Sequence, residues 1–145
     1  MPLSPPPFAQ ILSELEAVGT TTSFDYDDPT RPFTKHVRRE VPPGDAGGIY
    51  ILTATDRNEV IYIGKAGTVR TDGTRKRQSI RERLTAPRGG SSSDTWFADA
   101  ANAIGPFRVT VLPTPPDLAP GYVEALLLQA FLTEHGRLPS LNRSF

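Results

Sequence analysis

The residues best suited to chemistry in this chain are two tyrosines, each within a short apolar segment. Tyr50 ends the tripeptide Gly48-Ile49-Tyr50, and Tyr62 begins the tripeptide Tyr62-Ile63-Gly64, which Lys65 follows directly. An unperturbed tyrosine has a pKa near ~10, so it needs a nearby cation to act as a base at neutral pH. Lys65 could supply that charge. The alternative is that both tyrosines pack in a sheet with their hydroxyls at its rim.

The two tripeptides resemble the signature of the GIY-YIG nuclease superfamily, and the resemblance extends over residues 47–142. It implies an endonuclease that depends on Mg²⁺ (or Mn²⁺) and hydrolyses DNA phosphodiester bonds by direct attack of water. It also implies roles for single residues: Tyr50 as the general base, Tyr62 as the group that orients the water or the phosphate, and Lys65 as a catalytic cation. Gly64 would allow a close backbone approach where its strand ends. Asn142 would brace the site through hydrogen bonds of its amide.

The same resemblance places a phosphate-binding arginine on the helix expected after the second tripeptide. Arg83 stands at the family's helix arginine, with Arg81 as the competing choice on another helix face. A guanidinium binds phosphate through two parallel hydrogen bonds and stays charged at every relevant pH. A surface ion pair is the structural alternative. One turn later, where active members usually carry Tyr or His, this chain has Pro87, so that group would be missing or would come from elsewhere, such as His36.

The expected metal ligand falls in the segment from Glu124 to Gln129. By register with the excision-repair branch of the family, the ligand position is Gln129. A neutral amide binds Mg²⁺ poorly compared with a carboxylate. Glu124 is the candidate carboxylate, but it lies roughly 140° away around a helix, so the helix would have to be rotated. An acid favoured by the dipole of the first helical turn is the alternative explanation for Glu124.

Positive charge gathers directly after the second tripeptide. Residues 65–88 contain eight Lys or Arg and two acids, whereas the whole chain has 16 of each sign and a formal net charge of zero. Such a stripe can bind a phosphate backbone, although a solvated surface is the alternative. The predicted nucleic-acid-binding residues are Arg75, Lys76, Arg77, Arg81 and Arg88.

The apolar patterns predict an α+β fold: a small three-stranded antiparallel sheet flanked by helices, ordered β-β-α-α-β-α after an N-terminal helix. Strands are expected over 47–54, 60–66 and 107–112, and helices over 8–18, 75–84, 95–104 and 121–135. Residues 68–73 are expected to form a loop. Residues 1–46 are expected to form the N-terminal helix and an extended linker, and residues 47–145 the nuclease-like domain.

Two stretches of the N-terminal region admit other interpretations. Residues 20–30 are polar and contain Asp25, Asp27 and Asp28, but they lack the length and closing glutamate of a calcium loop. Residues 33–41 could form a short strand or a linker, and their basic residues could form a second, smaller patch.

Composition excludes several classes of protein. The chain has no cysteine, which excludes disulfides and thiolate metal sites, and its two histidines are too few for a zinc site built on histidine alone. It has neither an apolar run of membrane-spanning length nor a secretory pattern at the N-terminus, so a cytoplasmic protein without a membrane partner is expected. DNA is the expected partner, and a dimer is left open. The rival functions are an inactive nucleic-acid-binding module and a protein-interaction domain.

Overall fold

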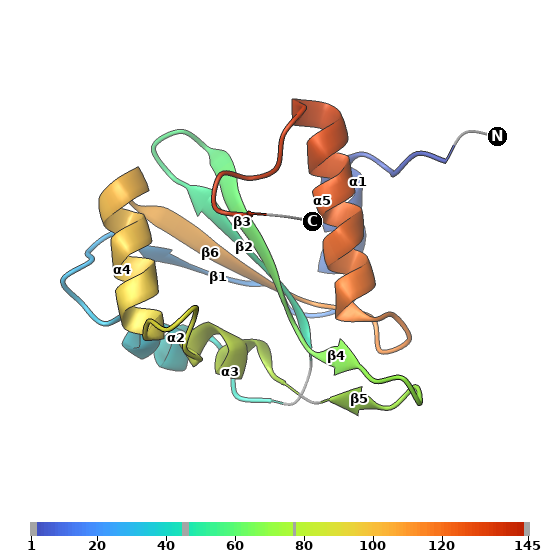
Figure 1. The fold of residues 1–145 in the computed structure, drawn as a ribbon, viewed down its shortest axis with the longest axis horizontal. Coiled ribbons are helices and arrows are strands. Elements are labelled where there is room, and N and C mark those ends of the chain that lie inside the picture. Colours follow the sequence, from blue (N-terminus) through green and yellow to red (C-terminus); the bar gives the residue numbers. More distant parts are fainter. Residues whose placement is uncertain (1–2, 45–46, 77, 144–145) are drawn as a thin grey trace.

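An antiparallel sheet with helices on both faces organises the computed structural model, which describes residues 3–44, 47–76 and 78–143 (Figure 1). Within these residues the main sheet has four strands, in the order β1 (Thr22–Tyr26), β6 (Phe107–Pro113), β2 (Gly48–Ala54) and β3 (Glu59–Ala66). Helices α2 (Phe33–Glu40), α3 (Ile80–Thr85) and α4 (Ser93–Ile104) cover one face. Helices α1 (Phe8–Glu16) and α5 (Pro120–His135) cover the other. The α+β class is as expected.

The predicted hairpin is present, and its register decides which side chains share a face. Tyr50 lies opposite Gly64, and Leu52 lies opposite Tyr62. Because side chains alternate along a strand, the two tyrosines share one face of the sheet. Lys65, paired with Ile49, begins on the opposite face.

Each face of the sheet has its own apolar core. On the tyrosine face, aromatic rings fill the space under α2 and α4, with Phe33 stacked on Phe97 at a centroid distance of 3.7 Å. On the other face, Ile51 and Ile63 pack with residues of α1 and α5, such as Leu127. Burial of these apolar side chains on both faces holds the helices against the sheet.

The N-terminal region departs from the sequence prediction. Strand β1 pairs with β6, so the sheet has a fourth strand where three were predicted and a linker was expected. Phe24 and Tyr26 point inward from β1 while polar residues alternate outward, which is the pattern of a strand with one buried face. Residues 33–40 form helix α2 rather than a strand or linker, because Phe33 and Val37 are buried one helical turn apart.

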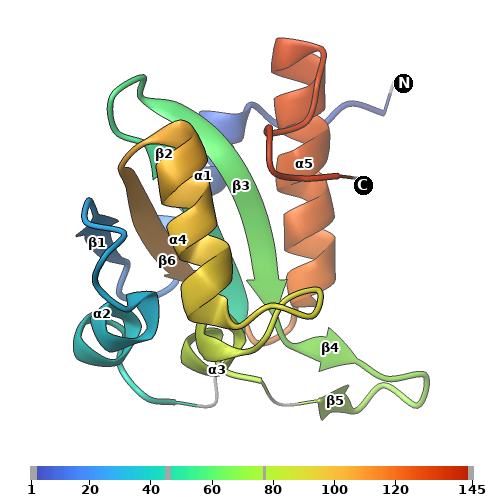
Figure 2. The ribbon, with the colours of Figure 1, turned by 60° about the vertical axis from the view of Figure 1, so that its left-hand side comes forward.

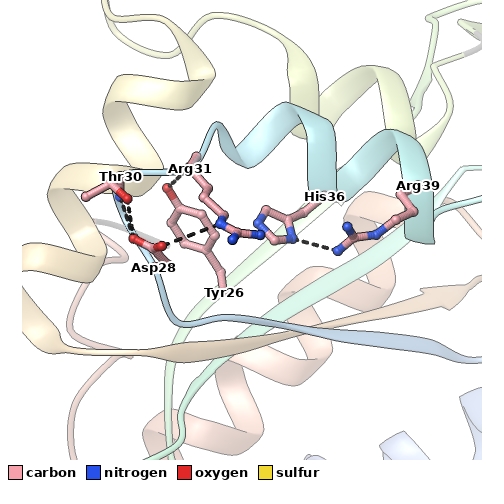
Figure 3. Close-up of polar contacts among 6 residues, drawn as sticks. All are labelled: Tyr26, Asp28, Thr30, Arg31, His36 and Arg39. Atoms are coloured by element: carbon pink, nitrogen blue, oxygen red, sulfur yellow. Dashed lines mark hydrogen bonds and ion pairs between the residues drawn. The ribbon is translucent and has the colours of Figure 1, made fainter.

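Two of the three aspartates of this region, Asp25 and Asp28, have separate partners. Asp25 pairs with Arg108 across β1 and β6 at 3.0 Å. Asp28 accepts hydrogen bonds from the backbone and hydroxyl of Thr30 and lies 3.5 Å from Arg31 (Figure 3). Among residues 3–44, 47–76 and 78–143, no three His, Cys, Asp or Glu side chains form a group that could hold a metal ion.

The segment between β3 and α4 is rearranged relative to the prediction. Arg75–Lys76 form strand β5, which pairs with β4 (Thr68–Val69), so the expected loop is part of a hairpin and the expected helix over 75–84 begins only at Ile80. Ser79 caps α3 by accepting a hydrogen bond from the Glu82 backbone N–H.

Helices α4 and α5 begin and end at clear local signals. Ser92 caps α4, and Asp94 accepts hydrogen bonds from the backbone and hydroxyl of Thr34 on α2. Gly136 ends α5 in the left-handed conformation (φ 71°). Within the described part of the chain, no helix is both long enough and apolar enough to span a membrane.

The segment after α5 returns across the free edge of β3. The Leu141 backbone N–H donates to the Ile61 carbonyl at 2.9 Å. The Asn142 side chain accepts from the Ile63 N–H and donates to the Ile63 carbonyl, both at 2.9 Å. These bonds satisfy backbone groups that an edge strand would otherwise leave unpaired.

Candidate active site

Tyr50 is buried at the centre of the tyrosine face, directly across Gly64. A Cβ atom built on Gly64 would lie 2.2 Å from Cζ and 2.4 Å from Oη of Tyr50. These distances are far below ordinary contact, so only glycine leaves room for the ring. The close approach expected at Gly64 is therefore made by the phenol of Tyr50.

Arg88 is the cation that contacts Tyr50. Its Nη2 donates a hydrogen bond to the Tyr50 hydroxyl at 2.7 Å, and the side chain is buried. The guanidinium carbon lies 5.4 Å from the ring centroid of Tyr50, 5.9 Å from that of Tyr62, 5.0 Å from that of Trp96 and 4.9 Å from that of Phe97. Aromatic faces attract a guanidinium at such distances. Arg88 is therefore buried among aromatic rings, and its role in nucleic-acid binding stays a prediction.

The surroundings of Tyr50 act on its pKa in opposing directions. Burial raises the pKa to about 12, while the positive charges of Arg88 and Arg83 oppose the rise. Burial dominates because the phenolate loses its hydration, whereas the neutral phenol loses less. Tyr50 is therefore a protonated phenol near neutral pH. The cations that act on it are Arg88 and Arg83, where Lys65 was expected.

A cleft of about 240 Å³ brings together the five residues predicted to form the site. It is lined by Tyr50, Tyr62, Lys65, Arg83 and Glu124, together with Gly67, Thr68 and Gln78. These residues come from β2, β3, β4, α3, α5 and the short segments between β3 and β4 and between β5 and α3. The cleft lies at the edge strand β3, and Figure 2 shows this strand between α4 and α5. Lys65 reaches it from the opposite face of β3, with its Nζ 3.4 Å from the Gly67 carbonyl oxygen.

Helix α5 presents Glu124, and not Gln129, to the cleft. Gln129 is exposed and donates a hydrogen bond to the Thr133 hydroxyl at 3.3 Å. Glu124 is half-buried, and burial raises the pKa of its carboxyl above the usual 4.5, while Lys65 and Arg83 oppose this shift. The first turn of α5 contains no acidic residue, so a preference for the helix N-terminus does not explain Glu124.

The donor set of the cleft is compatible with one hard divalent cation. Mg²⁺ keeps several waters and is usually held by one or two carboxylates together with phosphate oxygens of the substrate. A single half-buried carboxylate beside open volume, with two cations suited to phosphate nearby, matches that requirement. Burying a carboxylate is unfavourable unless a partner compensates it, which a bound cation would do.

A larger cleft of about 830 Å³ continues from the smaller one. The two share Tyr62, Arg83 and Glu124, and the larger cleft extends over Arg88 and Trp96 toward Asn142. The Asn142 amide is hydrogen-bonded to Ile63, the residue next to Tyr62, as described above. Together the two clefts form an elongated depression along β3 between α4 and α5.

Other predicted residues lie away from these clefts. The Arg81 guanidinium donates to the Arg38 carbonyl at 2.9 Å, at the junction of α3 and α2. His36 lines a separate pocket on α2 with Arg31, Lys35 and Arg39. Its Nδ1 lies 3.1 Å from the Arg39 guanidinium (Figure 3). Lys76 is exposed on β5, Arg75 lies in the same strand, and Arg77 lies outside the described residues.

Sequence reasoning missed the role of Arg88 and the contributions of Trp96 and Gln78. A signal for Arg88 was present, because it directly follows Pro87, the position where the resemblance places an aromatic or imidazole side chain. Comparison of the chain with protein-family models, with curated proteins and with solved structures returned no match in any of the three.

Proposed function

We propose that this chain is a divalent-metal-dependent endonuclease of the GIY-YIG type that hydrolyses phosphodiester bonds of DNA. The observation that carries the proposal is the convergence of Tyr62, Lys65, Arg83 and Glu124 on one cleft, although they come from separate segments of the chain. Hydrolysis of a phosphodiester requires neutralisation of phosphate charge, an activated water and a stabilised leaving oxygen. Cations, hydroxyls and a carboxylate in one cleft are suited to these tasks.

Lys65 and Arg83 bind the phosphate in this proposal. Both line the same cleft as Glu124, and both charges oppose the rise in the pKa of its carboxyl. The planar guanidinium of Arg83 suits two phosphate oxygens at once, whereas Lys65 acts as a point charge. Their combined charge offsets the repulsion between the phosphate and Glu124.

Glu124 would hold the divalent cation, which supplies positive charge that polarises water and stabilises negative charge on the phosphate. Tyr62 lines both clefts, and its hydroxyl would orient the attacking water or a phosphate oxygen. The Tyr50 hydroxyl is held in place by Arg88. The resemblance assigns the base role to Tyr50, and its phenolate form is favoured by Arg88 and Arg83 but opposed by burial.

An inactive nucleic-acid-binding module of the same fold is the second candidate. The observation in its favour is that the Tyr50 side chain is fully buried, which raises the pKa of its hydroxyl to about 12. A module of this kind would use Lys65, Arg83 and the wider cleft to hold a phosphate backbone without cleaving it.

Cleavage assays with matched variants of α5 test the proposal. Supercoiled plasmid and short DNA duplexes are incubated with the protein in Mg²⁺, Mn²⁺ or EDTA, using the wild type, Glu124→Gln and Gln129→Ala. We expect nicking with either metal and none in EDTA. Glu124→Gln should lose at least about 100-fold in rate, on the scale of removing one transition-state stabiliser. Gln129→Ala should cleave like the wild type.

Two outcomes would contradict the proposal. Cleavage in EDTA, or equal cleavage by Glu124→Gln, would remove Glu124 and the cation from the reaction. No cleavage of any substrate, together with DNA binding that weakens as salt rises, would favour the binding module.

A further inference from the structure

The hairpin formed by β4 and β5, residues 68–76 and here called the ribbon, projects from the body of the molecule in both views (Figures 1 and 2). Its turn is ordered by its own hydrogen bonds: Arg70 N–H donates to the Thr74 carbonyl at 2.7 Å, and Asp72 accepts from the Thr74 backbone at 3.0 Å. Gly73 takes the left-handed conformation (φ 85°) that this turn needs. The ribbon is thus internally ordered although it extends into solvent.

Both ends of the ribbon are anchored at the smaller cleft. Thr68 begins β4 and lines that cleft, and Gln78, two residues after β5, lines it as well. Gly67, with φ 101°, turns the chain from β3 into β4. Any polymer whose backbone lies in the cleft therefore passes the base of the ribbon.

The exposed surface of the ribbon is positive and includes one apolar side chain. Arg70 and Lys76 are exposed, and Val69 is 40% exposed. The only acid in the ribbon's sequence is Asp72, whose carboxylate accepts hydrogen bonds from Thr74. Positive side chains suit phosphates, and an apolar side chain at a groove suits a thymine methyl group.

We propose that the ribbon enters the major groove of duplex DNA beside the cleft and sets where the duplex is held; the identity of the partner rests on the proposed function. A two-stranded ribbon fits a major groove about 12 Å wide and about 8.5 Å deep. The paired arms, residues 68–70 and 74–76, have three residues each and at about 3.3 Å per residue reach about 10 Å, which exceeds the depth of the groove.

Equilibrium binding in EDTA tests this inference without relying on cleavage. Affinity for a short duplex and for a single strand of equal length is measured over a salt series, for the wild type, Arg70→Ala and Lys76→Ala. The control is Arg57→Ala, which removes the same charge in the turn between β2 and β3, at the far end of that hairpin from the ribbon. Thermal unfolding of each variant checks that the fold is retained.

We expect Arg70→Ala and Lys76→Ala each to weaken duplex binding and to reduce the salt slope by about 1, whereas Arg57→Ala changes neither. Single-strand binding should change less than duplex binding. Any one of four results would overturn the inference. Two concern duplex DNA: no binding by the wild type, or unchanged binding by both ribbon variants. The other two are a loss of binding in Arg57→Ala as large as in the ribbon variants, and a loss on single strands as large as on duplexes. Ribbon-dependent binding without cleavage in Mg²⁺ would contradict only the proposed nuclease function. Cleavage with unaltered salt slopes would contradict only the ribbon's role.

Discussion

Replacing Gly64 with alanine is the sharpest test of how the centre of the site is packed. The new Cβ would lie 2.2 Å from Cζ of Tyr50, whereas non-bonded carbon atoms normally approach to about 3.5–4.0 Å. The ring has little room to withdraw, because Tyr50 is fully buried and its hydroxyl is bonded to Arg88 at 2.7 Å. The substitution must therefore displace the tyrosine or separate the strands.

The expected loss of stability follows from two effects. Overpacking a well-filled core costs about 1–3 kcal/mol. A displaced Tyr50 would also leave its hydroxyl and the buried Arg88 guanidinium without their hydrogen bond, at about 1–3 kcal/mol more. Alanine also lowers the conformational entropy of the unfolded chain, which offsets about 0.4–1 kcal/mol of this loss of stability. We therefore expect Gly64→Ala to lower the free energy of unfolding by about 2–4 kcal/mol, a large fraction of typical total stability.

Urea unfolding of a small set of variants measures this loss. Gly121→Ala is the matched control, because its Cβ would lie 3.7 Å from the Lys65 Nζ, an ordinary contact, on helix α5. It should leave stability unchanged or raise it by up to about 1 kcal/mol. In a Tyr50→Ala background the clash is absent, so Gly64→Ala should cost less than about 1 kcal/mol. The reasoning is refuted if Gly64→Ala is as mild as Gly121→Ala, or if its full cost persists without the Tyr50 ring.

Two further predictions concern titration at the site. The folded-state pKa of Glu124 is raised, so the stability linked to its protonation is fully present below pH 4.5 and is lost as the pH rises through the folded-state value. The Glu124→Gln side chain cannot ionise, so this variant should unfold at a higher urea concentration than the wild type at pH 7. The difference in urea midpoint should disappear below pH 4.5. A difference that stays constant at all pH values would contradict the raised pKa of Glu124. With a pKa of about 12, the fraction of Tyr50 present as phenolate rises about tenfold per pH unit between about pH 7 and 9. If Tyr50 is the general base, the cleavage rate should rise by the same factor. A flat profile, measured under saturating metal, would show that Tyr50 acts as a hydrogen-bond donor instead.

Local patterns were sufficient for several elements. The hairpin of β2 and β3, strand β6 and helix α5 lie close to their predicted bounds and are confirmed. In each of these elements, apolar residues recur at the spacing of a strand or of a helix over most of the element. Turn or cap residues such as Gly136 mark an end. Prediction failed where the apolar pattern was short. The five residues of β1 were expected to belong to a linker, and α3 has six residues where a longer helix was expected.

The sequence by itself determined five of the chemical groups that line the candidate site, because residue type is a local property, whereas the register that puts both tyrosines on one face came from the structure. It predicted Tyr50, Tyr62, Lys65, Arg83 and Glu124, and the structure brings these five residues to one cleft. Their roles in catalysis remain predictions.

Only the tertiary structure decided which charges meet. The rotation of α5 on the sheet turns Glu124 to the cleft and Gln129 to solvent, and this rotation is set by packing of buried residues such as Leu127 and Leu128. The chain after α3 returns Arg88 into a cage of aromatic rings from two strands and a helix, next to Tyr50. Burial and the distance between charges are properties of the packed molecule, so no spacing along the chain could show that burial outweighs the arginines at Tyr50.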